Sequence, residues 1–273
     1  MTLTLDQWTK YRDLLKALSD KAADEFRDAI WKKDGYFKGV GLGSIPRDEV
    51  INYAYFLIDK YGAGSAALAC EMYDAVAALS KVMVEPAIPA EIASIEDVGK
   101  AINGAIKQSQ NEEYVSSVVG RFVKQVGQDT TLKNAKRDGA EAAWIPGGET
   151  CAYCLALASY GWQPVTARVA QGDHAEHIHA NCDCAYAIRF NNDSGVEGYR
   201  PDRYEDIFDM AENRAEKDGY EVSGSYNTAP DKVNAVRRMA YRNTKDRINA
   251  QKRDAYEKRK ERNSSEAEEI NVN

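Results

Sequence analysis

Residues 144–154 read Trp-Ile-Pro-Gly-Gly-Glu-Thr-Cys-Ala-Tyr-Cys, and residues 177–184 read His-Ile-His-Ala-Asn-Cys-Asp-Cys. Four of the five cysteines and all three histidines of this 273-residue chain lie between residues 144 and 190. The cysteines form a C-x-x-C pair and a C-x-C pair that are separated by 27 residues. This spacing fits a structural zinc site, because each pair can sit on a tight turn while the intervening loop folds back.

The predicted zinc ligands are four of five clustered residues: Cys151, Cys154, His179, Cys182 and Cys184. His177 lies two residues further back and could substitute for one of them. Thiolate and imidazole both suit Zn²⁺, and a closed tetrahedral site leaves no open position for a reacting water. A redox pair or merely packed cysteines are the alternatives, but both leave the histidines unexplained. The cluster therefore predicts a structural zinc module.

Two catalytic interpretations of the same stretch are weaker. His174-Ala-Glu176 matches the H-x-E of zinc deaminases, but in that class the cysteine pair follows the H-x-E and comes after a proline. A hydrolase could use Cys151 as its nucleophile and His177 as its base. Bound metal would quench that nucleophile, so we expect a protein that is not an enzyme.

The composition is ordinary for a globular protein, with 44 % apolar and 29 % charged residues. No apolar run approaches the roughly 18 residues of a membrane helix, so no membrane partner is expected. The first residues lack a basic patch followed by an apolar stretch, and no signal peptide is expected. In a reducing cytoplasm, paired cysteines more often hold metal than a disulfide.

The hydrophobic spacing predicts a mainly α fold. Apolar residues recur at three- and four-residue steps in five segments of the first 140 residues, which predicts helices at 5–33, 47–61, 66–82, 95–110 and 112–139. The breaks between them are assigned to glycines and prolines, including Gly62, Gly64, Pro86 and Pro89.

The second part of the chain is predicted to be a small α+β module. Val165 and Thr166 are β-branched, residues 185–190 alternate weakly, and residues 204–217 predict a helix that Gly219 ends. The expected domains are a helical region at 1–140, the Cys/His zinc-binding module at 141–222, and a basic tail at 223–273.

The tail is electrostatically distinct from the rest of the chain. Residues 231–262 contain 12 basic and 5 acidic residues, whereas the whole chain carries a formal charge of −7. A 15-residue repeat there predicts one long basic helix, and the acidic, polar residues after 262 are expected to be disordered. Nucleic-acid phosphate would be bound by Arg237, Arg238, Tyr241, Lys252, Arg253 and Tyr256. A helix that binds a protein, or a solvated helix with internal ion pairs, is the alternative.

The arrangement Cys-x-x-Cys, a glycine-bearing spacer and His-x-Asn-Cys-x-Cys resembles the minor head (head morphogenesis) proteins of tailed bacteriophages, the Mu F-like group. Residues 61–74 are similar to the region that precedes this module in minor capsid proteins of phages of Gram-positive hosts. The resemblance covers about residues 50–190, and residues 247–256 resemble C-terminal extensions of some such proteins. It departs at Ala180, where many members have proline.

The resemblance implies a non-catalytic virion component present in few copies in the head interior, and in the host cytoplasm during assembly. It would act in head assembly and in genome packaging or delivery. Its partners would be the portal and the major capsid or scaffold proteins, with DNA as a further partner of the basic tail. The alternatives are a zinc-module nucleic-acid-binding protein and a Cys/His hydrolase.

Overall fold

The computed structural model describes residues 2–109, 111–147, 152–166, 183–220 and 233–240, together with Asn243, Lys245, Ala250 and Arg253. The chain divides into two compact units, Met1–Pro201 and Asp202–Asn273. The first unit contains the region in which five helices were predicted and the described part of the Cys/His module up to Pro201. We describe each unit separately.

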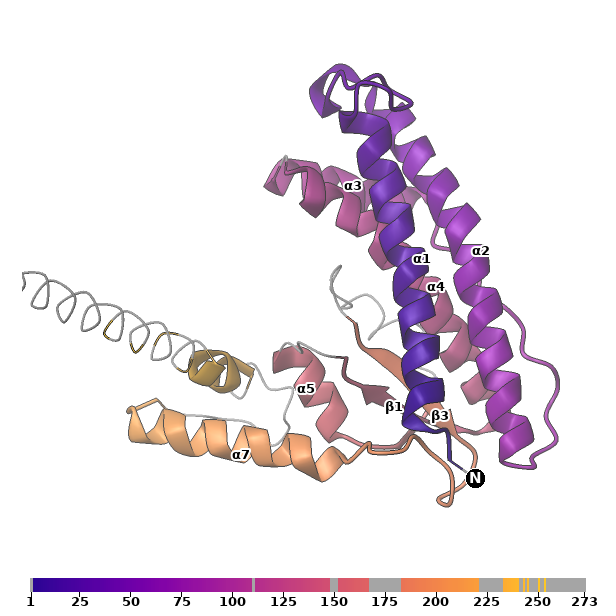
Figure 1. Cartoon of the computed structure of the whole chain (residues 1–273), viewed down its shortest axis with the longest axis vertical. Coiled ribbons are helices and arrows are strands. Elements are labelled where there is room, and N and C mark those ends of the chain that lie inside the picture. Colours follow the sequence, from indigo (N-terminus) through magenta and orange to yellow (C-terminus); the bar gives the residue numbers. More distant parts are fainter. Residues whose placement is uncertain are drawn as a thin grey trace, which may run out of the picture. The chain divides into compact units, whose positions relative to one another are not determined.

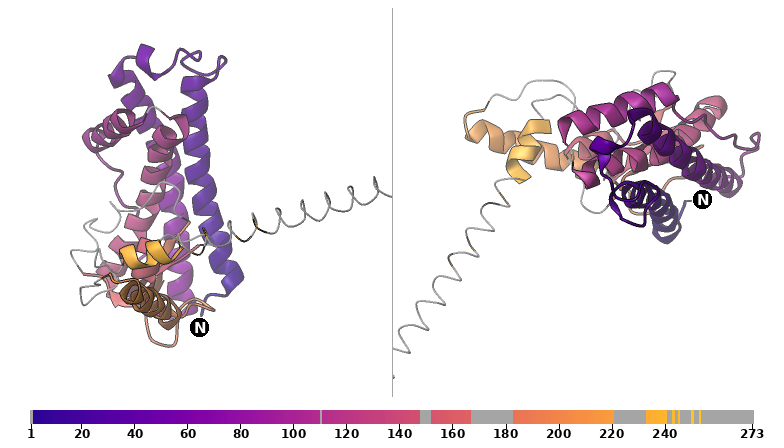
Figure 2. Two further views of the ribbon diagram at one scale, coloured as in Figure 1. Left: turned by 90° about the vertical axis from the view of Figure 1, so that its left-hand side faces the viewer. Right: turned by 90° about the horizontal axis from the view of Figure 1, so that it is seen from above.

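The first unit is built on four α-helices, which confirms the predicted mainly helical fold: α1 (Leu5–Trp31), α2 (Arg47–Leu79), α3 (Ile95–Gln108) and α4 (Glu112–Asp138). The three long helices α1, α2 and α4 lie side by side (Figures 1 and 2), and α3 packs against α2 and α4. A short 3₁₀ helix, Leu42–Ser44, lies in the loop between α1 and α2.

The ends of these helices follow their capping residues. Thr4 caps α1 in a capping box, in which its hydroxyl accepts from the Gln7 N–H and the Gln7 side chain accepts from the Thr4 N–H. Asn111 caps α4 through a bond from the Tyr114 N–H. Gly139 ends α4 in the left-handed conformation, at φ +68°. The predicted boundaries of α1 and α4 are therefore confirmed to within two residues.

The predicted helix break at Gly62 and Gly64 is wrong, because α2 runs through both residues. A Cβ at Gly62 would lie 3.3 Å from Cγ2 of Val126 on α4, and one at Gly64 would lie 3.6 Å from Cδ1 of Leu18 on α1. Glycine costs about 1 kcal/mol inside a helix relative to alanine. At Gly62 the missing side chain lets α2 approach α4 closely, whereas a Cβ at Gly64 would make an ordinary contact with α1. Packing along α2 therefore overrides the local preference.

A three-stranded antiparallel sheet completes the first unit, with the order β2-β1-β3. Its strands are β1 (Glu141–Ile145), β2 (Gln163–Pro164) and β3 (Ala185–Arg189), and a short helix, α5 (Ala152–Ser159), follows β1. The predicted strand at 185–190 is confirmed as β3. The strand expected at 165–166 lies two residues earlier and is short, because proline lacks the N–H needed to extend a ladder. Neither β1 nor α5 was predicted.

Two hydrophobic clusters form the core of this unit. One lies among the helices and includes Phe26, Leu57, Ile102 and Val119. The other joins the helices to the sheet and includes Trp8, Tyr73, Leu132, Trp144 and Tyr186. The second cluster places the cysteine-bearing segments directly on the helical scaffold.

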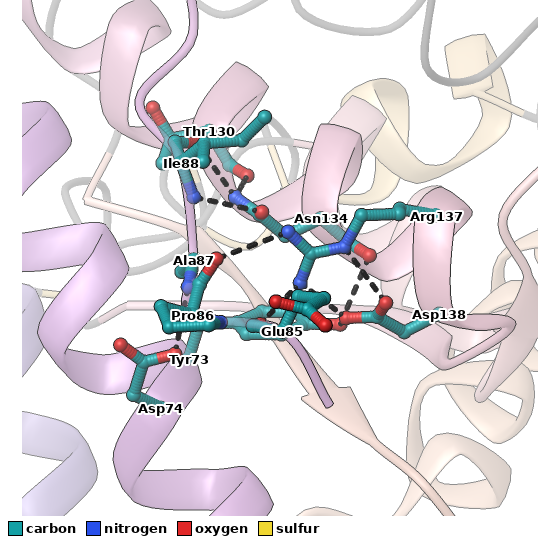
Figure 3. Close-up of polar contacts among 10 residues, drawn as sticks. All are labelled: Tyr73, Asp74, Glu85, Pro86, Ala87, Ile88, Thr130, Asn134, Arg137 and Asp138. Atoms are coloured by element: carbon teal, nitrogen blue, oxygen red, sulfur yellow. Dashed lines mark hydrogen bonds and ion pairs between the residues drawn. The ribbon is translucent and has the colours of Figure 1, made fainter. Parts of the chain in front are cut away.

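Residues 82–94, which we call the strap, connect α2 to α3 and have no regular secondary structure. The strap runs along α4, where side chains pair with its backbone (Figure 3). The Asn134 amide accepts from the Ile88 N–H at 3.0 Å and donates to the Ile88 carbonyl at 2.8 Å. Thr130 Oγ1 accepts from the Ala90 N–H at 3.0 Å. Instead of the predicted turn at Pro86 and Pro89, the chain therefore forms an extended segment that α4 holds in place.

The second unit contains α7 (Pro201–Lys217) and the helical residues 233–240. The helix predicted at 204–217 is confirmed and begins three residues earlier, with proline at a position where its missing N–H costs nothing. Gly219, at φ +79°, follows the end of α7 as predicted.

Candidate functional site

The structure describes two of the five predicted zinc ligands, and both are buried. Cys154 lies in the first turn of α5 and Cys184 directly precedes β3. Each is 2 % exposed, and both belong to the core cluster beside the sheet. The remaining predicted ligands and the other histidines lie outside the described residues: Cys151, His174, His177, His179 and Cys182.

Antiparallel pairing brings the two cysteine-bearing segments together. β1 pairs with β3 so that Trp144 faces Tyr186 and Ile145 faces Ala185, which places the end of β1 beside the start of β3. Just beyond this pairing, the Gly147 N–H donates to Cys184 Sγ at 3.5 Å. The segment that leads to the C-x-x-C pair therefore contacts the C-x-C pair directly.

Glycine is required at this contact for steric reasons. A Cβ at Gly147 would lie 2.6 Å from the Asp183 Cβ and 2.8 Å from the Asp183 carbonyl oxygen. Both distances are shorter than non-bonded contacts of a Cβ atom allow, and the backbone oxygen cannot rotate away. Gly147 thus lets the two segments approach to hydrogen-bonding distance.

Among the described residues, the side chains packed around Cys154 and Cys184 are mainly apolar. Trp144 and Tyr186 make an edge-to-face contact with ring centroids 4.6 Å apart, and α5 covers them. A cavity of about 90 Å³ beside them is lined by Ala142, Trp144, Leu157, Tyr160, Pro164 and Tyr186. Burial raises the pKa of the Tyr186 hydroxyl well above its usual value.

This environment bears on what the cysteines can do. Reactive cysteines are partly exposed and lie in electropositive surroundings, whereas a thiol in apolar surroundings stays protonated and inert. Cys154 and Cys184, each 2 % exposed, lack the exposure of a nucleophile. Their burial fits thiolates whose charge a bound cation compensates, and it equally fits neutral core thiols. Among the described residues, no three His, Cys, Asp or Glu side chains gather to hold a metal.

The outer edge of the sheet is held by the side chain of Gln128, which no sequence pattern indicated. Gln128 of α4 is fully buried, and its Oε1 accepts from the Tyr186 N–H at 2.8 Å. At the far end of the strands, Arg189 forms a 2.6 Å ion pair with Glu141. These contacts fix β3, and with it Cys184, against the helices.

A second polar cluster joins α2, α4 and the strap (Figure 3). Tyr73 donates to Asp138 at 2.8 Å, and Arg137 contacts the same carboxylate at 2.6 Å. Arg137 also donates to the carbonyl oxygens of Glu85 and Pro86. Hydrogen bonding from Arg137 lowers the pKa of Asp138. The pKa of Tyr73 is raised, mainly by burial and to a smaller extent by its hydrogen bond to Asp138. Because each charge is compensated, this cluster is structural.

The predicted nucleic-acid-binding residues are described in part. Arg237 and Arg238 are exposed on the helical residues 233–240, and Arg253 is also exposed. Arg238 lies over the ring of Tyr220, 4.3 Å from its centroid. Tyr241, Lys252 and Tyr256 lie outside the residues whose side chains are described. Nucleic-acid binding by the tail therefore stays a prediction. None of the described helices is long and apolar enough to cross a membrane.

Together, the fold and this site define a mainly helical protein that carries a small antiparallel sheet with cysteines at its edge. A family model described as "VG15 protein" matches residues 2–211, and the chain belongs to this family of phage gene proteins. Comparison with curated proteins and with solved structures gave no significant match. The match spans α1 through most of α7, so the phage origin implied by the resemblance is supported for the helices and the sheet together.

Proposed function

We propose that the chain is a phage minor capsid protein that acts in head morphogenesis by an architectural, non-catalytic role. Its place would be the interior of the virion head near the portal. The observation that supports this most is the contact between Gly147 and Cys184, which joins the two cysteine-bearing segments on a buried sheet. A phage gene product with a fixed fold around its cysteines suits a structural part of a particle.

In this proposal Zn²⁺ is held by four of the five predicted ligands: Cys151, Cys154, His179, Cys182 and Cys184. The metal would supply a fixed cross-link between two segments that are distant in sequence. Structural zinc contributes an apparent 10 to 16 kcal/mol, on the order measured for zinc-finger peptides, so it could dominate the stability of such a module. The sheet would then orient the module against α4.

The partners in this proposal are the portal and the major capsid or scaffold proteins. Side chains for such contacts are present on the helical unit, where Tyr36 is 72 % exposed, Phe56 54 % and Met83 98 %. Exposed aromatic and methionine side chains are enriched at protein interfaces. The basic tail would contact DNA during packaging or delivery.

A zinc-module nucleic-acid-binding protein is the second candidate, and the exposed arginines of residues 233–240 favour it. A Cys/His hydrolase would need Cys151 as its nucleophile, and that residue lies outside the described residues.

The experiment that tests the proposal is quantitative mass spectrometry of purified particles. We expect the chain in DNA-filled heads at a few copies, far below the major capsid protein, and we expect aberrant or empty heads when its gene is deleted. A chain that is missing from particles, together with normal heads after deletion, would contradict the proposal. If the chain is present in particles but binds no zinc, the assembly role stands and only the proposed metal site is ruled out.

A further inference from the structure

A pocket of about 320 Å³ lies within the second unit, between the end of α7 and the helical residues 233–240. Three of its lining side chains are cationic: Arg214, Arg238 and Lys245. We propose that this pocket, which we call the α7 pocket, binds a phosphate group. The proposal does not depend on zinc or on the assembly role, and it deepens the predicted contact of the basic tail with nucleic acid, for which Arg238 was already named.

The sequence builds one wall of the α7 pocket through the way in which α7 ends. Gly219 adopts φ +79°, and its N–H bonds to the Glu216 carbonyl at 2.9 Å, while the Tyr220 N–H bonds to the Ala215 carbonyl at 2.9 Å. This pair of bonds is the Schellman motif, which satisfies the last carbonyls of a helix and turns the chain back. The motif places Tyr220 beside Ala215, and both side chains line the pocket.

The helical residues 233–240 build the opposite wall. Val233, Ala235 and Val236 are buried, and Ala235 lines the pocket together with Ala211 of α7. These small residues leave room between the two helices. Arg238 then lies over the Tyr220 ring at 4.3 Å from its centroid. A cation over an aromatic face is held in place while its N–H groups stay available to an acceptor.

The charges of the α7 pocket favour an anion. Arg214 pairs with Asp218 at 3.7 Å, which offsets one of the three cations. In the described part of the chain, no ion pair engages Arg238 or Lys245. The pocket therefore keeps an excess of positive charge on a guanidinium and an ammonium. A guanidinium matches phosphate oxygens in a bidentate geometry, and lysine adds a point charge.

The ligand class is a phosphate ester. The volume lies within the range of small-molecule sites and accommodates a phosphate with part of the group that carries it. A polynucleotide backbone and a free mononucleotide present the same chemistry. The net charge of the whole chain is −7, so a polynucleotide would have to approach through this locally basic part of the molecule.

The test uses the full-length protein and two arginines of the second unit. Arg238→Ala removes a residue that lines the pocket, whereas Arg203→Ala removes the same charge from an exposed position of α7 that does not line it. Binding of a labelled oligonucleotide, and separately of dAMP and inorganic phosphate, is measured from about 50 to about 200 mM salt. Circular dichroism checks that both variants keep their helices.

We expect Arg238→Ala to weaken binding of at least one phosphate probe about tenfold and, for the oligonucleotide, to reduce the slope of log K against log salt by about 1. Arg203→Ala should change affinity by less than about threefold. Tyr220→Leu, which keeps an apolar contact but removes the ring under Arg238, should weaken binding in the same direction. Loss with oligonucleotide alone identifies a polynucleotide site, and loss with dAMP or phosphate identifies a small-ligand site. Equal losses from both arginine variants, or no binding of any probe, would overturn the proposal.

Discussion

The backbone N–H of Gly147 donates a hydrogen bond to the Sγ of Cys184 at 3.5 Å, across 37 residues of sequence. The contact exists because β1 and β3 pair up to Ile145 and Ala185, immediately before it. It ties the chain leading into the C-x-x-C pair to the C-x-C pair. The arrangement of the module therefore depends on a glycine as well as on its cysteines.

We expect Gly147→Ala to destabilise the protein by about 1 to 3 kcal/mol, because the new Cβ would overlap the backbone of Asp183. Urea unfolding followed by circular dichroism measures the change. Gly43→Ala is the matched control, since a Cβ there meets nothing within 4 Å. Equal midpoints for the two variants would show that the contact at Gly147 is not tight.

Asn134→Ala should release the strap. Asn134 is fully buried and satisfies both the N–H and the carbonyl of Ile88, so its loss leaves backbone groups without these partners. We expect a cost of about 1 to 3 kcal/mol and faster hydrogen exchange of the Ile88 amide in the strap. Asn52→Ala, at an exposed position of α2, makes the same change in helix propensity without a buried partner. Unchanged exchange in the strap would contradict the role of Asn134.

Asp138 should contribute to stability in a pH-dependent way. Its pKa is lowered in the folded state, first by the hydrogen bond from Arg137, with burial opposing and Tyr73 adding to the effect. A lowered pKa gives stability that is present above the unfolded value of about 3.9 and is lost as the pH falls through the folded value. Asp138→Asn should therefore be less stable than wild type at neutral pH, with the difference shrinking below about pH 4. Asp59→Asn, at an exposed position of α2, is the control, and a pH-independent difference would refute the linkage.

Replacing each of two helical glycines with alanine should change the free energy of unfolding in opposite directions. A Cβ at Gly120 of α4 would lie 2.8 Å from the Ser19 carbonyl oxygen, where Ser19 Oγ also donates to the Gly120 carbonyl. A Cβ at Gly104 of α3 meets nothing within 4 Å. We expect Gly120→Ala to destabilise by about 1 to 3 kcal/mol and Gly104→Ala to stabilise by up to about 1 kcal/mol. Thermal unfolding of the two variants measures both changes in stability. If both variants were stabilised, or both destabilised, the described packing of α1 against α4 would be contradicted.

The sequence predicted the long helices because their buried stripes repeat at helical spacing, as with Trp8, Tyr11 and Leu15 in α1. It failed at Gly62, where a local signal for a break was overridden by contact with α4. That contact joins residues 64 positions apart, and no local pattern reports it. The same holds for Asn134, whose role depends on where the strap lies.

β1 could not be predicted from periodicity because almost every residue of Glu-Ala-Ala-Trp-Ile is buried. A strand that is covered on both faces has no polar alternation, and its two alanines equally suit a helix. The spacing of the cysteines was enough to locate the candidate site, but it did not predict the side chains and backbone contacts that support the site. Gln128 and Gly147 act through contacts across 58 and 37 residues, which spacing does not reveal.

The central claim is that a bound metal joins the two cysteine pairs, and zinc content tests it most directly. Protein purified without chelator and analysed by mass spectrometry of its metals should contain about one zinc per chain. Cys154→Ser and Cys184→Ser should lose most of that zinc. Cys70→Ser should retain it, because Cys70 lies on α2 outside the cluster. A zinc content near zero in the wild-type protein, or full zinc retention in both cluster variants, would contradict the account.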